Sequence, residues 1–167
     1  MKISKLLHPD LIKLELETVI PEEVLEINKP EIRVGKIKEL LVKEFVDILC
    51  KSGKVQSSNK LYTDLLNRER KASTAIGEGI AIPHVRSMHV REFLMGFAKS
   101  SAGYEYAAPD GEPVHLFFLM VSPNYEENLY LKVYKELANL LKFEELKEKL
   151  LNASTVQEVI WGMGKWE

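Results

Sequence analysis

Two near-continuous apolar runs, residues 93–98 and 114–121, constrain the fold more than any other feature of this 167-residue sequence. Both consist mainly of apolar residues. The first contains two Phe residues and the second contains both Phe and Val, which are types that strands favour. A strand with one face in water alternates apolar and polar residues, whereas a strand buried on both faces does not. The runs therefore predict two strands of a sheet that is covered on both faces, with turns at Gly103 and at residues 109–111 between them.

Segments with helical spacing of apolar residues lie on both sides of these strands. The longest follows Pro30, with apolar residues three and four positions apart from Val34 to Leu49. Spacing, cap residues and Pro21 predict further elements, namely a strand at residues 11–16 after a polar break at 8–10, and helices beginning at 21 and 57, at 126–141 and 144–151, and beginning at 154. Helices before and after the strands predict one α/β layered domain over residues 1–167.

Composition and charge exclude several classes of protein. The sequence has 23 Lys and Arg against 25 Asp and Glu, a net charge of -2 with no block of like charge, so we expect no nucleic-acid partner. Cys50 is the only cysteine, which rules out a disulfide within the chain and suggests a small core residue. No apolar run approaches the roughly 20 residues of a membrane span, and the N-terminal residues lack a signal-peptide pattern. We therefore expect a cytoplasmic protein with no direct membrane insertion.

Residues 77–84 are the strongest candidate for chemistry. Gly77 and Gly79 flank a turn, and the short apolar stretch that follows ends at Pro83, which favours extended backbone at Ile82. This pattern predicts that His84 lies exposed where a strand ends, with little core packing. A neutral imidazole is a competent nucleophile toward a phosphoryl group, and the usual histidine pKa leaves most copies neutral in the cytoplasm.

A phosphoryl site at His84 also needs groups that bind negative charge. Arg68 and Arg86 are the candidate cations, and the Ser73 and Thr74 hydroxyls, with backbone N–H groups of the glycine turn, are candidate phosphate ligands. The residues alone leave an alternative open, because a histidine at the end of an apolar strand is more often a partly buried, hydrogen-bonded side chain. A metal site is not expected, because it would need more ligands than His84 alone. His89 lies five positions after His84, and on a helix that spacing turns the two side chains to different faces.

Other candidates are weaker. The sequence contains no Gly-x-Ser-x-Gly elbow, so it gives no indication of a serine hydrolase. His8 and His89 fall in polar segments and are expected at the surface. His115 lies near the start of the second apolar run, and we expect its ring to bond the turn at Asp110 and Gly111.

The motif as a whole resembles a known family. Arg68 and Glu69, residues 73–77 and residues 79–84 together resemble the enzyme IIA domain of the fructose–mannitol class of the phosphoenolpyruvate-dependent sugar phosphotransferase system, which includes nitrogen-regulatory relatives. Further similarity at residues 6–12, 110–114, 122–123 and 151–154 extends the resemblance over nearly the whole chain.

The resemblance implies a mixed β-sheet with helices on both faces and a phosphohistidine intermediate at His84, with no cofactor. It implies that Arg68 neutralises phosphate charge and that Ser73 and Thr74 line the pocket. The donor would be the histidine-containing phosphocarrier protein or a nitrogen-branch paralogue. The acceptor would be the IIB domain of a membrane sugar transporter, unless the phosphorylated form is itself a regulatory state read by a target protein.

Three positions depart from the family pattern. Asn128 stands where the family usually has a second histidine, and its amide can donate a hydrogen bond but cannot carry charge. Val85 and Ala75 replace glycines, which alters how closely a partner can approach the backbone. These changes bear on onward transfer, so replacing Asn128 with histidine is expected to alter phosphoryl lifetime or transfer.

Three functions follow from these patterns. The first is a phosphocarrier in a sugar uptake chain, and the second is a regulatory protein of the nitrogen-branch type that binds partners according to its phosphorylation. The third is an interaction domain that keeps the fold and is not phosphorylated. Retention of Arg68, the Ser73–Thr74 loop and His84 argues against the third, and Asn128 favours the second.

Overall fold

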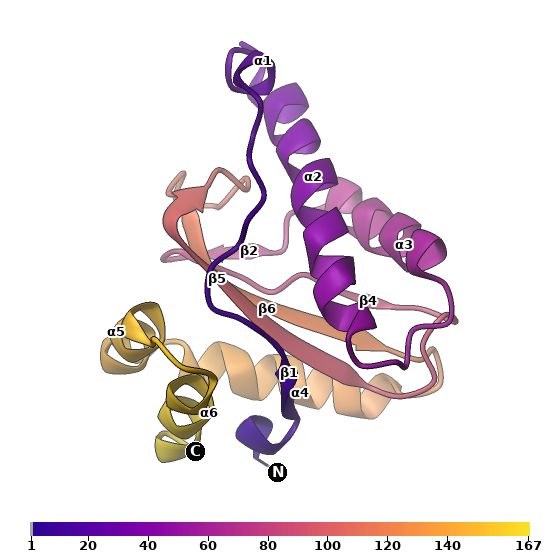
Figure 1. The fold of residues 1–167 in the computed structure, drawn as a ribbon, viewed down its shortest axis with the longest axis vertical. Coiled ribbons are helices and arrows are strands. Elements are labelled where there is room, and N and C mark those ends of the chain that lie inside the picture. Colours follow the sequence, from indigo (N-terminus) through magenta and orange to yellow (C-terminus); the bar gives the residue numbers. More distant parts are fainter. Residues whose placement is uncertain (1) are drawn as a thin grey trace.

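The computed structural model describes residues 2–167, apart from the side chain of Glu127. Within that range the centre of the molecule is a mixed sheet of six strands (Figure 1). The strands are β1 (Leu7–Lys13), β2 (Ala75–Gly77), β3 (Ile80–Ala81), β4 (His84–Arg86), β5 (Leu94–Tyr104) and β6 (Val114–Ser122). They are ordered β1-β5-β6-β3-β2, and β4 pairs with β6 beyond the end of β3.

The two apolar runs form the central pair of this sheet, as the sequence predicts. Strands β5 and β6 are antiparallel, with Phe97 opposite Phe118, and nearly every residue of β6 is buried. The outer pairings β1 with β5, β3 with β6 and β4 with β6 are parallel, and β2 with β3 is antiparallel. The sheet is therefore mixed, and its centre is covered on both sides.

Helices cover both faces. Helices α2 (Pro30–Cys50) and α3 (Ser58–Lys71) lie on one face, and α4 (Glu127–Leu140), α5 (Glu144–Asn152) and α6 (Val156–Lys165) lie on the other (Figure 1). A 3-10 turn (Ile3–Lys5) and the short α1 (Glu22–Leu25) complete the described elements. Ser57 and Thr155 cap α3 and α6 by accepting hydrogen bonds from backbone N–H groups in the first turn, as their sequence positions predict.

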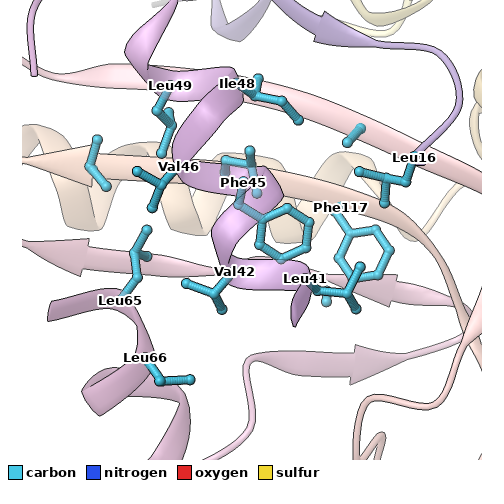
Figure 2. Packing of buried hydrophobic residues seen from close by; sticks show 14 of the residues in the cluster. Leu16, Leu41, Val42, Phe45, Val46, Ile48, Leu49, Leu65, Leu66 and Phe117 are labelled. Carbon is cyan, nitrogen blue, oxygen red and sulfur yellow. The ribbon is translucent and has the colours of Figure 1, made fainter. Parts of the chain in front are cut away.

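Each face has its own apolar core. On the α2 side, Phe45 packs against Phe117 of β6 with ring centroids 5.1 Å apart, among aliphatic residues of α2 and α3 (Figure 2). On the α4 side, Phe97 and Phe118 pack against residues of the C-terminal helices. Alternation along the strands sends Ala81 into the first core and Ile80 and Ile82 into the second.

Some local predictions were wrong. The polar break at residues 8–10 lies inside β1, which begins at Leu7 and pairs with β5 through a register shift. Gly103 does not make a turn between strands but sits within β5 at positive φ, where the pairing with β6 also shifts. A Cβ at Gly103 would lie 2.7 Å from the His115 ring. The positive φ and this close contact therefore both favour glycine at position 103.

The predicted hydrogen-bond partner of His115 was also wrong. The His115 ring bonds the Ser100 carbonyl at 2.9 Å instead of the turn at Asp110 and Gly111, because the irregular pairing near Gly103 brings Ser100 beside it.

Among the described residues, no helix combines the length and apolarity needed to cross a membrane.

Candidate functional site

His84 is the first residue of β4 and is buried, with 9% of its surface exposed. The expectation of an exposed side chain at a strand end was wrong. The chain does not leave the sheet after Pro83 but continues as β4, where His84 lies opposite Met120 of the buried strand β6. The side chain follows Ile80 and Ile82 onto the α4 side of the sheet, so α4 covers it.

The backbone next to His84 selects the state of the imidazole. Its Nδ1 lies 2.5 Å from the carbonyl oxygen of Ile82. A carbonyl oxygen only accepts hydrogen bonds, so Nδ1 carries the proton and the lone pair is on Nε2. Burial lowers the pKa of His84, the positive charge of Arg68 acts in the same direction, and the Ile82 bond and Glu69 oppose them. The ring is therefore neutral at neutral pH with Nε2 as its nucleophilic atom.

Two tyrosines of α4 flank this ring. The Tyr130 ring centroid is 5.4 Å from that of His84 and the Tyr134 centroid is 5.1 Å away, at interplanar angles of 53° and 57°. Residues four positions apart share a face of a helix, so one face of α4 presents both rings to the imidazole. Both rings therefore contribute to the burial that lowers the pKa of His84.

The two predicted arginines approach the site from different elements. Arg68, near the end of α3, is half-buried, and its Nη1 donates to the Ala72 carbonyl at 2.8 Å. Arg86 is in β4 two residues after His84, and its guanidinium carbon is 6.0 Å from the centroid of the Tyr130 ring. Both arginines line a shallow groove of about 360 Å³ beside Val85. The fold thus brings two cations to the edge of the sheet at which His84 lies.

The hydroxyls of Ser73 and Thr74 make hydrogen bonds within the protein. Thr74 donates both its hydroxyl and its backbone N–H to the carboxylate of Glu69, and Ser73 donates its hydroxyl to the Tyr106 carbonyl at 2.8 Å. The Tyr106 hydroxyl and the Lys38 ammonium also donate to Glu69, at 2.8 and 3.2 Å. A role of Ser73 and Thr74 in phosphate binding stays a prediction.

This buried network nevertheless bears on His84. The Thr74 carbonyl accepts a hydrogen bond from the N–H of Ile82 at 3.0 Å, and the Ile82 carbonyl accepts the His84 Nδ1–H. Glu69 therefore holds Thr74, Thr74 holds Ile82, and Ile82 orients the imidazole. Each link is a hydrogen bond to backbone or from a buried side chain, so the orientation of His84 is well determined.

Asn128 lies in the first turn of α4 and is exposed. It is two residues before Tyr130, which places it about 200° around the helix from the face that contacts His84. Its proposed part in phosphoryl transfer stays a prediction.

Sequence reasoning missed the roles of Tyr130, Tyr134 and Glu69. The two tyrosines carry a faint signal, since they are four residues apart in a helix that follows the second apolar strand. Glu69 carries none beyond its place beside Arg68. As for metals, the described residues contain no group of three or more His, Cys, Asp or Glu side chains that could hold an ion.

Comparison with known protein families gives one match over most of the chain. Residues 6–161 match the family described as "Phosphoenolpyruvate-dependent sugar phosphotransferase system, EIIA 2". The chain is 34% identical over 160 residues to the "PTS system fructose-specific EIIABC component" of Bacillus subtilis, covering 96% of this chain and 22% of that protein. It is 30% identical over 149 residues to the "PTS system fructose-specific EIIA component" of Haloferax volcanii, covering 87% of this chain and 94% of that protein.

Relatives with regulatory names are also similar. The chain is 28% identical over 145 residues to a "Nitrogen regulatory protein" of Bradyrhizobium diazoefficiens, covering 86% of this chain and 90% of that protein. Among solved structures, "Nitrogen Regulatory Protein IIA-Ntr from Neisseria meningitidis" superimposes with a TM-score of 0.79 at 26% identity, covering 96% of this chain and 98% of that one. The fold of IIA mannitol from Escherichia coli is also similar, with a TM-score of 0.72 at 21% identity over 93% of this chain and 97% of that one.

Proposed function

The chain belongs to the EIIA 2 family of the phosphoenolpyruvate-dependent sugar phosphotransferase system, and we propose that it carries a phosphoryl group on Nε2 of His84. The observation that supports this most directly is the hydrogen bond from His84 Nδ1 to the Ile82 carbonyl. It leaves the lone pair on Nε2 in a ring whose lowered pKa keeps it neutral. That is the state in which a histidine attacks phosphorus.

The transfer step follows from this geometry. The Nε2 lone pair forms a bond to phosphorus while the P–N bond of the donor, the phosphorylated histidine-containing phosphocarrier protein, breaks and leaves its electron pair on the donor nitrogen. The Nδ1 proton stays in place, and the Ile82 carbonyl stabilises the positive charge that the ring acquires. Arg68 and Arg86 stabilise the charge of the phosphoryl oxygens.

For the next step we propose transfer to the IIB domain of a sugar transporter. A solved complex of a mannitol IIA enzyme with its phosphorylated IIB partner has a similar IIA fold, with a TM-score of 0.69 at 21% identity, over 93% of this chain and 95% of that chain. The relatives named as fructose-specific components support the same role. For that role we propose that the chain acts in the cytoplasm and meets the transporter at the membrane surface.

A regulatory role is the second candidate. The similarity to the nitrogen regulatory proteins favours it. In that role the added charge of about -1.5 to -2 on His84 changes which target protein binds. A domain that is never phosphorylated would not need a neutral, oriented imidazole with cations nearby, so we rank that alternative last.

Intact-mass analysis after incubation with phosphoenolpyruvate, enzyme I and the histidine-containing phosphocarrier tests the proposal. We expect one acid-labile phosphoryl group on the wild type and on His8→Ala, which removes an exposed histidine, and none on His84→Gln. Glutamine retains bulk at the buried site, so the loss of label does not reflect a cavity. Label that persists in His84→Gln, or a wild type that takes none, would contradict the proposal.

A further inference from the structure

Tyr130 lies close to both the imidazole and one of the two arginines. Its ring centroid is 5.4 Å from that of His84 and 6.0 Å from the guanidinium carbon of Arg86. The three side chains come from two elements, because Tyr130 is in the first turn of α4 while His84 and Arg86 are in β4. One aromatic ring of α4 is therefore near both the imidazole that we propose is phosphorylated and a cation that could bind its phosphoryl group.

The hydroxyl of Tyr130 is suited to donate a hydrogen bond there. Burial raises the pKa of Tyr130, and the charges of Arg68 and Arg86 act against this rise. The phenol is thus protonated at neutral pH and has a proton to donate. Because both arginines act on the same hydroxyl, it lies in the positive field that attracts a phosphoryl group.

The position of Asn128 makes Tyr130 the better placed donor on α4. Asn128 is exposed and lies about 200° around the helix from the face that carries Tyr130 and Tyr134. An amide on that side of α4 is directed away from the imidazole, whereas Tyr130 contacts it. The side chain of α4 that reaches the phosphoryl site in this chain is thus a phenol.

We propose that the Tyr130 hydroxyl donates a hydrogen bond to the phosphoryl group on His84 and so prolongs the lifetime of the phosphohistidine. This inference rests on the function proposed above. It assigns to Tyr130 direct contact with the transferred group, and it assigns to Tyr134 only packing. Tyr134 is as close to the imidazole, at 5.1 Å, but is one turn further along α4, and the cation contact is made by Tyr130.

The test uses potassium phosphoramidate, a small donor that needs no partner protein. Attack by Nε2 forms the new N–P bond, and the P–N bond of phosphoramidate breaks to release ammonia. After removal of the reagent, the first-order loss of the phosphoryl group is followed by intact mass in the wild type, Tyr130→Phe and Tyr134→Phe, and label on the other histidines is subtracted by treating His84→Gln in the same way. The phenylalanine variants keep each ring and remove only the hydroxyl, and thermal melting checks that both are folded.

We expect the phosphohistidine of Tyr130→Phe to be lost about tenfold faster than that of the wild type, as for a lost hydrogen bond to a charged group. Tyr134→Phe should stay close to the wild type. Equal lifetimes in the wild type and Tyr130→Phe would overturn the inference, as would equal acceleration in both variants. If His84 accepts a phosphoryl group neither from phosphoramidate nor from the phosphorylated phosphocarrier, the proposed function fails and this inference fails with it, whereas a labelled His84 with unchanged lifetimes rejects Tyr130 alone.

Discussion

The two faces of the sheet contribute to His84 in different ways. On the α3 side, a carboxylate buried among hydrogen-bond donors holds the backbone that orients the ring, through Glu69, Thr74 and Ile82. On the α4 side, Tyr130 and Tyr134 enclose the same ring and exclude water from it. One face therefore orients the imidazole and fixes which of its nitrogens carries the proton, and the other contributes to the burial that keeps the ring neutral. Orientation needs a satisfied polar network, while desolvation needs only apolar surface.

The largest effect is expected on the orienting side. In Glu69→Ala the buried Lys38 ammonium loses its carboxylate, and Thr74 and Tyr106 lose their acceptor. We expect the free energy of unfolding to fall by about 3–5 kcal/mol, the range for removing one partner of a buried pair. Denaturant unfolding measures this loss.

Glu39→Ala is the matched control for Glu69→Ala, because Glu39 pairs with Arg70 on the surface. Its expected cost is about 0–1 kcal/mol. Similar losses in the two variants would show that the Glu69 network is not a special support of the site.

A smaller effect is expected from the ring itself. The sequence suggested that His84→Ala would leave the melting transition nearly unchanged. Since His84 is buried between two tyrosines, we now expect this variant to lose about 1–2 kcal/mol, within the usual range for a buried substitution. The exposed His8→Ala should stay within about 0.5 kcal/mol of the wild type by the same denaturant measurement. An unchanged His84→Ala would mean that α4 does not enclose the ring in solution.

The desolvating side has a signature in pH. Burial lowers the pKa of His84 in the folded state, so the unfolded chain binds a proton first as the pH falls. The stability that comes from the neutral ring is complete above the ordinary histidine pKa of about 6.5 and is lost as the pH falls below that value. Unfolding experiments between pH 5 and pH 8 should therefore show a shallower decline for His84→Gln than for the wild type. If the stability of the two proteins fell in parallel with pH, burial of His84 by α4 would not be the cause of the pH dependence.

The smallest effect is expected at Asn128. Because this side chain is exposed and lies away from the α4 face that contacts His84, Asn128→His should change the phosphohistidine lifetime less than Tyr130→Phe does. The same mass measurement after phosphoramidate treatment compares the two variants directly. A larger change in Asn128→His would mean that the first turn of α4 rearranges in the phosphorylated state.

Much of the fold was predictable because its signals are local. Helical spacing located α2 and α3, cap residues located the starts of α3 and α6, and unbroken apolar runs located β5 and β6. The errors arose where long-range pairing overrides local preference. Gly103 is a residue type that favours turns, but it lies in an irregular part of β5. His84 was predicted at the end of a strand, but it begins β4, which pairs with β6.

By itself, the sequence determined the family, the layered α/β architecture and the residue types available for chemistry, because periodicity, caps and the motif ending at His84 depend on neighbours in the chain. Only the tertiary structure decided that His84 is buried, that its Nδ1 bonds the Ile82 carbonyl and that the Tyr130 ring is close to both His84 and Arg86. Those features depend on the packing of α3 and α4 against opposite faces of one sheet, and the distances and desolvation that set the reactivity of a side chain arise only when distant segments meet.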